Sequence, residues 1–427
     1  MFLLDKLLKA LIREGALIVT DYDGSIHRYG DASAEPIGVR LMDRGAAWHI
    51  ARNPRMGTGE AYTDGRLVVQ PPHEIRDLVL FFMAQARRRG AAVEPISPLR
   101  RWSAKAASRL DQFNGRRRAK QNVEHHYELS RRFYELFLDE DRQYTMAYFR
   151  TPESTLERAQ LDKQALIAAK LHLPRDASSL RVLDIGCGWG GLGLYLNRHY
   201  GCEVLGVSLA ADQVAFANER ASAAGVADRV KFQLIDYRDV GGTFDRITSV
   251  GMLEHVGSGR FGEYFAKTNT LLADDGVMLT HTIGRTGPPG GTDPWVRKYI
   301  FPGHYLPAMS ELLTALENTR WKIGDIEVLR YHYAHTLAEW YRRTTLHEAE
   351  ITEMFDARFF RMWQFYLAGA EQGFRNDTMV NFHIQSVKRP GILPTTRDYI
   401  QTEMERLVSL DSEPRWHLSA ELTTAAE

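Results

Sequence analysis

The chain has few cysteines, no net charge and no long hydrophobic run. Its 427 residues include only Cys187 and Cys202, too few for a disulfide framework or a cysteine-rich metal site. A reducing, cytoplasmic compartment is therefore expected, and no metal site is predicted. The 54 basic residues balance 54 acidic residues, so the total charge does not favour a nucleic-acid partner. No apolar run reaches the roughly 18 residues of a transmembrane helix, so none is expected.

The remaining composition is that of an ordinary globular protein. Hydrophobic residues make up 44% and charged residues 25%, and the length fits two or three domains. The first 20 residues are apolar but interrupted by charges, which disfavours a secretory signal and favours an amphipathic helix. Such a helix either packs on its own domain or lies in a membrane interface. Short apolar runs at 17–19, 39–41 and 67–69, separated by turns, predict a small N-terminal α+β domain over residues 1–95.

A strongly basic segment follows at residues 87–120. It carries eleven lysines and arginines against Glu94 and Asp111, a local net charge of +9. Either it is a solvated linker, or it is attracted to anionic lipid headgroups at about 1 kcal/mol per basic residue. RNA is disfavoured because no glycine-aromatic RNA-binding motif accompanies the basic residues. We predict a basic linker and helical cap over 96–175, a catalytic domain over 176–412 and a tail over 413–427.

From residue 181 onward the sequence alternates between strands and helices, as in a doubly wound α/β sheet. Near the end, apolar Val380, Phe382 and Ile384 alternate with polar residues, which predicts a half-buried strand. In open α/β sheets, ligands bind beyond the carboxyl ends of the strands. Apolar runs predict strands at 182–185, 203–207, 230–235, 246–250 and 276–280.

The first of these strands leads into a glycine-dense turn, and a helix follows at 192–200. Glycines allow a tight turn and a close approach to a ligand, and the helix N-terminus favours a negative group. An acid, Asp184, precedes the glycines, which resembles class I methyltransferases rather than dinucleotide-binding dehydrogenases. In those methyltransferases the loop faces the methionine portion of the cofactor. The loop residues predicted to bind the cofactor are Asp184, Gly186, Gly188, Trp189 and Gly190.

Polar residues follow the next strands at the same edge. Ser208 and Gln213 stand where a ribose-binding group is expected, about 20 residues past the loop. Asp236, Tyr237 and Arg238 follow the third strand, where an acid can accept a hydrogen bond from the adenine amine and a ring can cover the base. Each residue alone is equally consistent with a turn or a cap. Polar strand ends in the right order favour a cofactor site.

A carboxylate and an imidazole follow the fourth and fifth strands. Glu254 lies in Gly251–Gly257, and His281 begins His281–Gly284, so both are expected on the ligand side of the sheet. Such a pair can hold a small polar species or move a proton. The alternative is an internal hydrogen-bonded pair with a structural role.

With these motifs, the chain resembles the cyclopropane-fatty-acyl-phospholipid synthase family, which includes the mycolic acid methyltransferases. The resemblance covers about residues 120–390, and the leading domain resembles the lipid-docking region of longer bacterial members. The segments that carry it are His126–Leu129, Gln143–Phe149, Asp184–Gly191, Gly251–Gly257, His281–Gly284, Asp293–Gly303 and Trp340–Tyr341.

The resemblance implies a Rossmann-like, seven-stranded methyltransferase sheet with S-adenosylmethionine as cofactor. The double bond of an unsaturated acyl chain, in a membrane phospholipid, would attack the sulfonium methyl. Loss of a proton from the resulting carbocation would close a cyclopropane ring, with bound bicarbonate as the base. Tyr144 and Thr145 match further cofactor positions. The implied holders of bicarbonate are Glu254, His281, the backbone of Ile283, and Tyr341.

The same resemblance implies peripheral contact with the cytoplasmic face of a membrane. A homodimer is compatible with it, although no residue pattern specifies one. Met146 and Ala370 replace family cysteines, and Ser130-Arg131 replaces the usual Gly-Asn. These departures argue against thiol chemistry and leave the product open. The alternatives are a methyl-branched or otherwise C-methylated lipid, or a non-catalytic lipid-binding module.

Overall fold

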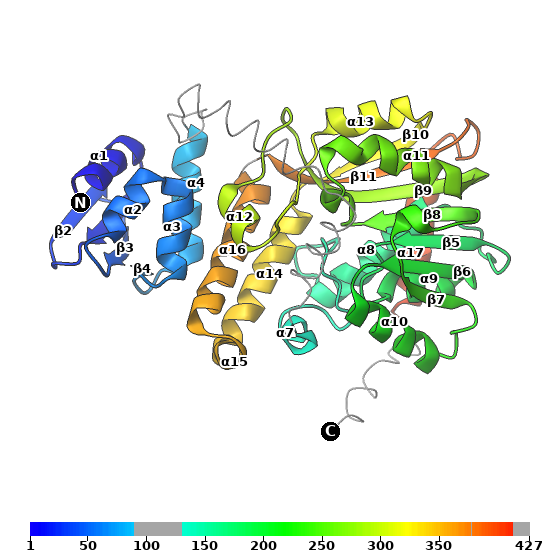
Figure 1. Cartoon of the computed structure of the whole chain (residues 1–427), viewed down its shortest axis with the longest axis horizontal. Helices are drawn as coiled ribbons and strands as arrows, with labels where there is room; N and C mark the ends of the chain where they lie inside the picture. Colours follow the sequence, from blue (N-terminus) through cyan, green and yellow to red (C-terminus); the bar gives the residue numbers. More distant parts are fainter. Residues whose placement is uncertain (89–129, 377, 413–427) are drawn as a thin grey trace. The chain divides into compact units, whose positions relative to one another are not determined.

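The computed structural model describes residues 1–88, 130–376 and 378–412. The basic segment beyond residue 88, the motif His126–Leu129 and the tail from 413 onward lie outside the described residues. The chain divides into two compact units (Figure 1). Unit 1 holds the described parts of 1–110, 291–302 and 337–379, and unit 2 holds the remainder. Two segments that the linear sequence groups with the catalytic domain, 291–302 and 337–379, therefore belong to unit 1.

Unit 1 begins with an amphipathic helix and a small mixed sheet. Helix α1 (Phe2–Leu11) buries Leu4, Leu8 and Leu11 and leaves Phe2 exposed, so it packs on its own unit by its apolar face. The sheet has the order β2-β1-β3-β4, with β1 parallel to β3 and the other pairs antiparallel. The three predicted strands of this region are confirmed as β1 Ala16–Thr20, β3 Pro36–Leu41 and β4 Leu67–Val69, and the structure adds β2 Ile26–Gly30, which was not predicted.

Helices make up the rest of unit 1. The side chain of Trp295 lies against Phe365, with ring centroids 4.8 Å apart. The buried Glu371 carboxylate accepts two hydrogen bonds from Arg76, at 2.6 and 2.7 Å, which tie α16 to α4. The helices are α2 Ala46–Arg52, α3 Pro54–Thr63, α4 Ile75–Arg88, α12 Pro294–Tyr299, the second half of α14 His332–Leu346, α15 Glu348–Met354 and α16 Ala357–Asn376.

Unit 2 is built on a seven-stranded sheet with the order β10-β11-β9-β8-β5-β6-β7. Strands β5 to β9 are parallel and β10 pairs antiparallel with β11, which is the predicted class I methyltransferase architecture. The predicted fold class is confirmed. The bounds are β5 Arg181–Ile185, β6 Glu203–Ser208, β7 Val230–Leu234, β8 Phe244–Val250, β9 Leu272–Arg285, β10 Lys322–Leu329 and β11 Met379–Val387.

Helices cover both faces of this sheet, so its central strands are apolar on both sides. Val182 belongs to a core cluster with α8, α9 and α17, whereas the next residue, Leu183, belongs to a cluster with α11 and α13. This alternation follows from the two-residue period of a strand. The helices of unit 2 are α7 Arg131–Glu135, α8 Leu156–Lys170, α9 Gly191–Tyr200, α10 Ala211–Ala223, α11 Phe261–Leu271, α13 Met309–Asn318 and α17 Asp398–Leu410. No helix within the described ranges is long and apolar enough to cross a membrane.

Two strand predictions are wrong in detail. The fifth predicted strand was expected to end at residue 280, but β9 runs on to Arg285, so His281 and Ile283 lie within it. The strand expected to be half-buried, β11, is an interior strand between β10 and β9. Its polar residues Asn381, His383 and Gln385 are therefore buried and form hydrogen bonds inside the fold, although Asn381 Oδ1 and His383 Nδ1 have no partner within the described residues.

Candidate active site

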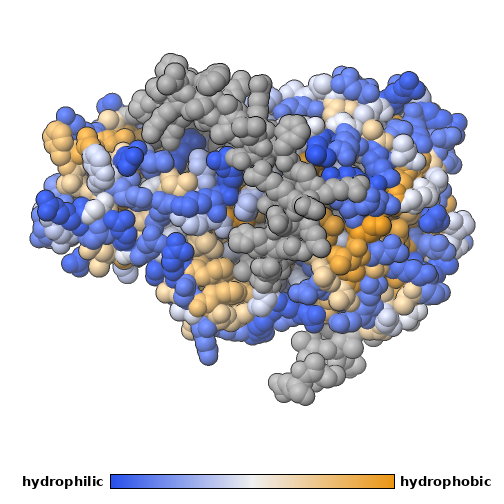
Figure 2. All heavy atoms as spheres, viewed as in Figure 1, coloured by the Kyte–Doolittle hydropathy of each residue, from blue (hydrophilic) through white to orange (hydrophobic). Residues whose placement is uncertain are grey.

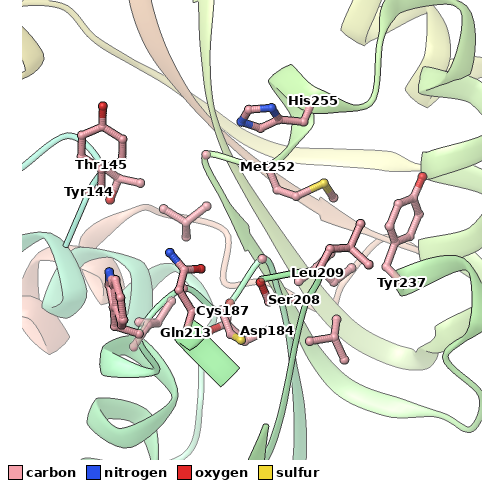
Figure 3. A pocket seen from close by; sticks show the side chains of 18 of the residues that line it. Tyr144, Thr145, Asp184, Cys187, Ser208, Leu209, Gln213, Tyr237, Met252 and His255 are labelled. Carbon is pink, nitrogen blue, oxygen red and sulfur yellow. The ribbon is translucent and has the colours of Figure 1, made fainter. Parts of the chain in front are cut away.

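A pocket opens at the carboxyl ends of β5, β6, β7 and β8, where a doubly wound sheet places its ligand. Figure 3 shows Asp184, Ser208 and Gln213 along the wall, with Tyr144 and Thr145 on one side and Tyr237 on the opposite side. Eleven of the twelve predicted cofactor residues line it. They are Tyr144, Thr145, Asp184, Gly186, Gly188, Trp189, Ser208, Gln213, Asp236, Tyr237 and Arg238.

The twelfth predicted cofactor residue, Gly190, belongs to the glycine loop but does not line the pocket. Gly186, Gly188 and Gly190 all have positive φ, at 83°, 52° and 84°, which favours glycine at each position. A Cβ at Gly188 would meet nothing within 4 Å, so this glycine faces the open pocket. Gly190 does not line the pocket. A Cβ there would lie 2.8 Å from Ala217 and from Phe232, so its role is close packing of the loop.

Asp141, an acidic residue of the chain itself, lies beside the N-terminus of α9. A Cβ at Gly191 would collide with Oδ2 of Asp141, so the carboxylate rests directly against the first turn of the helix. Arg220, Gln143 and Gln164 donate hydrogen bonds to the same carboxylate. A helix N-terminus binds anions, and in dinucleotide-binding folds that anion is the pyrophosphate. The Asp141 carboxylate lies beside this position and disfavours a second anion there, which argues against a dinucleotide.

A polar stripe on α8 holds the segment that carries Tyr144 and Thr145. Gln160 donates to the carbonyls of Gln143 and Thr145, at 3.2 and 3.0 Å. Lys163 donates to Gln143 Oε1 at 2.6 Å and to Thr145 Oγ1 at 2.9 Å. Lys163 also lines the pocket, although the sequence motifs did not single it out. In the sequence, Lys163 is part of a polar i, i+3, i+4 row with Gln160 and Gln164 on a helix of mixed composition.

The opposite end of the pocket is more exposed and its charges are paired. Asp236 accepts hydrogen bonds from the Arg238 guanidinium at 2.8 and 2.5 Å, so its predicted contact with an adenine amine must use a remaining lone pair. Tyr237 packs edge-on against Tyr264, with ring centroids 5.4 Å apart. Burial raises the pKa of Tyr237, so its hydroxyl stays protonated. The backbone N–H of Ala210 donates to the Ser208 hydroxyl at 3.2 Å.

Three of the predicted catalytic residues, Glu254, His281 and Ile283, belong to unit 2 and do not line this pocket. Glu254 is 1% exposed, and its Oε1 accepts a hydrogen bond from the backbone N–H of Ile283 at 2.5 Å. Its Oε2 is buried without a partner among the described residues. Burial raises the pKa of Glu254 to about 7, although the Ile283 N–H acts in the opposite direction. The Ile283 N–H was expected to hold bicarbonate directly, but here it donates to Glu254.

His281 is enclosed by two residues that sequence reasoning missed. Its Nε2 lies 2.9 Å from Asn381 Nδ2 and its Nδ1 lies 2.9 Å from His383 Nε2. If Asn381 donates to Nε2, the neutral ring carries its proton on Nδ1 and donates to His383. Burial lowers the pKa of His281 to about 3 and that of His383 well below its ordinary value. Both ring nitrogens of His281 are engaged, so its expected direct contact with bicarbonate is not present.

Tyr341 lies on the part of α14 that belongs to unit 1. Its side chain is 3% exposed, and its hydroxyl has no hydrogen-bond partner within the described parts of the chain. The Arg76 guanidinium lies 6.0 Å from the ring centroid. Burial raises the pKa of this phenol, so the hydroxyl is a donor. Within unit 2, Glu254 therefore contacts the Ile283 backbone and His281 contacts Asn381 and His383, whereas Tyr341 belongs to the other unit.

The positions that depart from the family are structural here. Met146 is fully buried in unit 2, and Ala370 lies on α16 in unit 1. Ser130 is the N-cap of α7, where its hydroxyl accepts a hydrogen bond from the Phe133 N–H at 3.3 Å. N-caps of this type stabilise a helix by about 1 kcal/mol.

Comparison with known proteins identifies the family. The family model described as mycolic acid cyclopropane synthetase matches residues 114–384. The chain belongs to this family. Cyclopropane-fatty-acyl-phospholipid synthase of Escherichia coli K12 is 34% identical over 340 residues, covering 80% of this chain and 85% of that protein. A probable fatty acid methyltransferase of Pseudomonas putida is 36% identical over 270 residues, covering 61% of this chain and 67% of that protein.

A solved structure of the mycolic acid cyclopropane synthetase family supports the same assignment. A mycolic acid cyclopropane synthase in complex with SAH and CTAB aligns with a TM-score of 0.59 and 28% identity, over 62% of this chain and 97% of that chain. Family and fold together make the chain a methyltransferase that depends on S-adenosylmethionine, as predicted.

Proposed function

We propose that this methyltransferase methylates the double bond of an unsaturated acyl chain in a membrane phospholipid and closes a cyclopropane ring. The observation that carries the proposal is Glu254. It is a buried carboxyl group with one unpartnered oxygen and a pKa raised to about 7 by burial, in the same unit as the methyl-donor pocket. A methyl transfer that ends in ring closure must also remove a proton, and such a site suits proton removal.

Two bound groups would supply the chemistry. S-adenosylmethionine supplies an electrophilic methyl group, whose transfer to one alkene carbon leaves a cation on its neighbour and returns the thioether. Bicarbonate supplies a base for the proton that leaves the new carbon as the ring closes. The chain's own residues bind these groups and keep water away. Glu254, His281 and His383 are each at most 1% exposed, and a dry site protects a carbocation from capture by water.

Glu254 fits a small oxyanion. Because burial favours its protonated form near neutral pH, the free oxygen can donate a hydrogen bond to an anion instead of repelling it. The Ile283 N–H fixes the other oxygen, and Asn381 and His383 fix the His281 ring. We assign Glu254 as the holder of bicarbonate within unit 2, and the role of Tyr341 stays a prediction. His281 and the Ile283 backbone act as groups that orient and support this site.

The principal alternative is a methyl-branched or otherwise C-methylated lipid. Met146 and Ala370 are the sequence features that favour it, because they replace family cysteines, and one relative is named only as a probable fatty acid methyltransferase. A non-catalytic lipid-binding module is a weaker alternative. Its weakness is that a binding module needs neither an open glycine loop nor a buried, half-partnered carboxyl group.

Membrane contact is the second part of the proposal. Unit 1 exposes large apolar side chains, and hydrophobic patches appear among hydrophilic ones on the face shown in Figure 2. Among them, Phe2 and Ile26 are 69% exposed and Trp48 is 58% exposed. With the basic segment, these residues suit a peripheral contact with anionic phospholipid. Replacing Arg116, Arg117 and Arg118 by Gln should weaken binding to anionic vesicles most strongly at low salt. If the affinity for anionic vesicles is unchanged by this replacement, the basic segment is only a linker. Homodimerisation stays a prediction.

A bacterial host that makes unsaturated phospholipids and expresses this chain tests the proposed reaction. Lipid extracts should gain species heavier by one methylene group on their unsaturated chains, and nuclear magnetic resonance should show the cyclopropane protons. Extracts with no new acyl species would contradict the proposed reaction. A new species that carries a methyl branch and no ring would favour the alternative.

A further inference from the structure

Two opposite charges line the cofactor pocket beside the glycine loop, and both are almost completely buried. Asp184 stands near the end of β5 and is 2% exposed, and Lys163 projects from α8 and is 1% exposed. Burial raises the pKa of Asp184 to about 7 and lowers that of Lys163 to about 8, because water no longer solvates either charge. Buried charges are costly unless a partner of opposite charge satisfies them.

Within the described parts of the chain neither residue forms an ion pair, although the carboxylates of Asp139, Asp141 and Asp184 all raise the pKa of Lys163 against the effect of burial. No ion pair joins Lys163 to Asp184 there, and the Asp184 carboxylate accepts no hydrogen bond from the described residues. Lys163 donates to two neutral oxygens, of Gln143 and Thr145, which leaves one of its three N–H groups. The two groups therefore line the same pocket and attract each other without forming a direct ion pair within the described residues.

The other basic residues that line the pocket differ from Lys163. The guanidinium groups of Arg142, Arg238 and Arg260 each pair with a carboxylate. The acceptors are Glu135, Asp236 and Glu263, at 2.5, 2.5 and 2.9 Å respectively. Among the described basic side chains of the lining, Lys163 is thus the cation that an anionic ligand could still engage.

The position of Asp141 bears on where an anion can bind. The N-terminus of α9 is the ordinary anion site of such a loop, but the Asp141 carboxylate lies against Gly191 and disfavours a second negative group there. The amino-acid end of the cofactor carries a carboxylate and an ammonium group, and both need partners in a buried pocket. The ammonium matches Asp184, and the carboxylate is left with Lys163.

We propose that Lys163 binds the α-carboxylate of the cofactor and forms, with Asp184, a pair that recognises the zwitterionic amino-acid end of S-adenosylmethionine and SAH. Lys163 is then a ligand-binding residue, and its bonds to Gln143 and Thr145 aim its ammonium group. A purely structural lysine would hold the segment 143–145 and make no contact with the ligand. The proposal concerns cofactor recognition and does not depend on the lipid acceptor.

Isothermal titration calorimetry on the full chain separates these roles. SAH and 5′-methylthioadenosine share the nucleoside and the sulfur, but the second lacks the amino-acid end. Lys163→Met should weaken SAH binding about 10- to 100-fold, the effect of losing one charged hydrogen bond. It should leave 5′-methylthioadenosine within about twofold. Lys267→Met is the matched control, because Lys267 donates to a neutral carbonyl outside the pocket. Equal weakening of both ligands, or of neither, would overturn the proposal.

A second measurement needs no variant and so does not depend on the folding of one. The decarboxylated analogue of SAH keeps the ammonium group and lacks the carboxylate. The unmodified protein should bind it about 10- to 100-fold more weakly than SAH. Equal affinity for the two ligands would show that no group reads the carboxylate, and would overturn the assignment of Lys163.

Discussion

Unit 2 contains two buried polar clusters, and they treat charge in opposite ways. In the cofactor pocket, Lys163 and Asp184 act on each other electrostatically, and this attraction opposes the effect of burial on the pKa of each group. In the other cluster, burial lowers the pKa of His281 to about 3 and raises that of Glu254 to about 7, so both favour their neutral forms near neutral pH. The first arrangement suits recognition of a charged ligand. The second suits proton transfer beside a short-lived cation, where fixed opposite charges would trap the substrate.

The largest effect should come from Glu254→Gln, which separates the two clusters most sharply. Turnover should fall about 10²- to 10⁴-fold, the usual contribution of a positioned acid or base, while SAH affinity stays unchanged because Glu254 does not line the pocket. Steady-state kinetics and calorimetry measure the two quantities. Glu317→Gln, at an exposed position of α13, is the control. Unchanged turnover would remove Glu254 from the mechanism.

The same variant should change how stability depends on pH. In the folded protein the pKa of Glu254 is raised to about 7 from its ordinary value of 4.5. The resulting contribution to the free energy of unfolding is fully present below pH 4.5 and is lost as pH rises through 7. Relative to the natural chain, the free energy of unfolding of Glu254→Gln should therefore rise by about 3 kcal/mol between these two pH values. Urea unfolding at a series of pH values measures the gain. A constant difference across the series would mean that Glu254 is ionised in the folded protein.

Gly191→Ala tests the close approach of the Asp141 carboxylate to the first turn of α9. The added methyl group would collide with Asp141, so overpacking should lower the free energy of unfolding by about 1–3 kcal/mol. Gly262→Ala is the control, because a Cβ at this helical position meets nothing within 4 Å. That control should raise the free energy of unfolding by up to about 1 kcal/mol. If both variants were stabilised, Asp141 would not rest against the helix as described.

The buried histidine pair makes the free energy of unfolding depend on acid pH. Because burial lowers the pKa of both rings, their contribution to stability is present above pH 6.5 and is lost as pH falls toward the folded pKa of His281, about 3. Each histidine should contribute about 1.4 kcal/mol per pH unit to this loss. His383→Gln should remove one such contribution. His27→Gln, at a partly exposed position of β2, should not. Equal acid sensitivity in the two variants would contradict the assignment.

Contiguous motifs made the cofactor pocket predictable. The glycine loop can be recognised in the sequence because a tight turn with positive φ at Gly186 and Gly188 favours glycine in any surroundings. Residues after successive parallel strands also converge by topology, which placed Ser208 and Tyr237 on the same lining. Lys163 was missed because its hydrogen-bond partners, Gln143 and Thr145, lie about 20 residues earlier in the sequence, and only the packing of α8 brings them to it.

The catalytic cluster was less predictable because it depends on which strands are neighbours. Asn381 and His383 gave the alternation of a half-exposed strand, and only the sheet order shows that β11 is interior and that its polar row meets His281. The same neighbours explain why His281 has no free ring nitrogen, and Glu254 explains why the Ile283 N–H is engaged. Tyr341 was assigned by resemblance, and its helix continues from one unit into the other.

The most direct test of the central claim uses the purified chain, phospholipid vesicles with monounsaturated acyl chains, and S-adenosylmethionine with a fully deuterated methyl group. Mass spectrometry and nuclear magnetic resonance of the product acyl chains give both the label and the bonding. Ring closure predicts that the double bond disappears and that two of the three deuterium atoms remain in a cyclopropane methylene. Acyl chains that gain no label, or that retain all three deuterium atoms in an intact methyl group, would contradict the account.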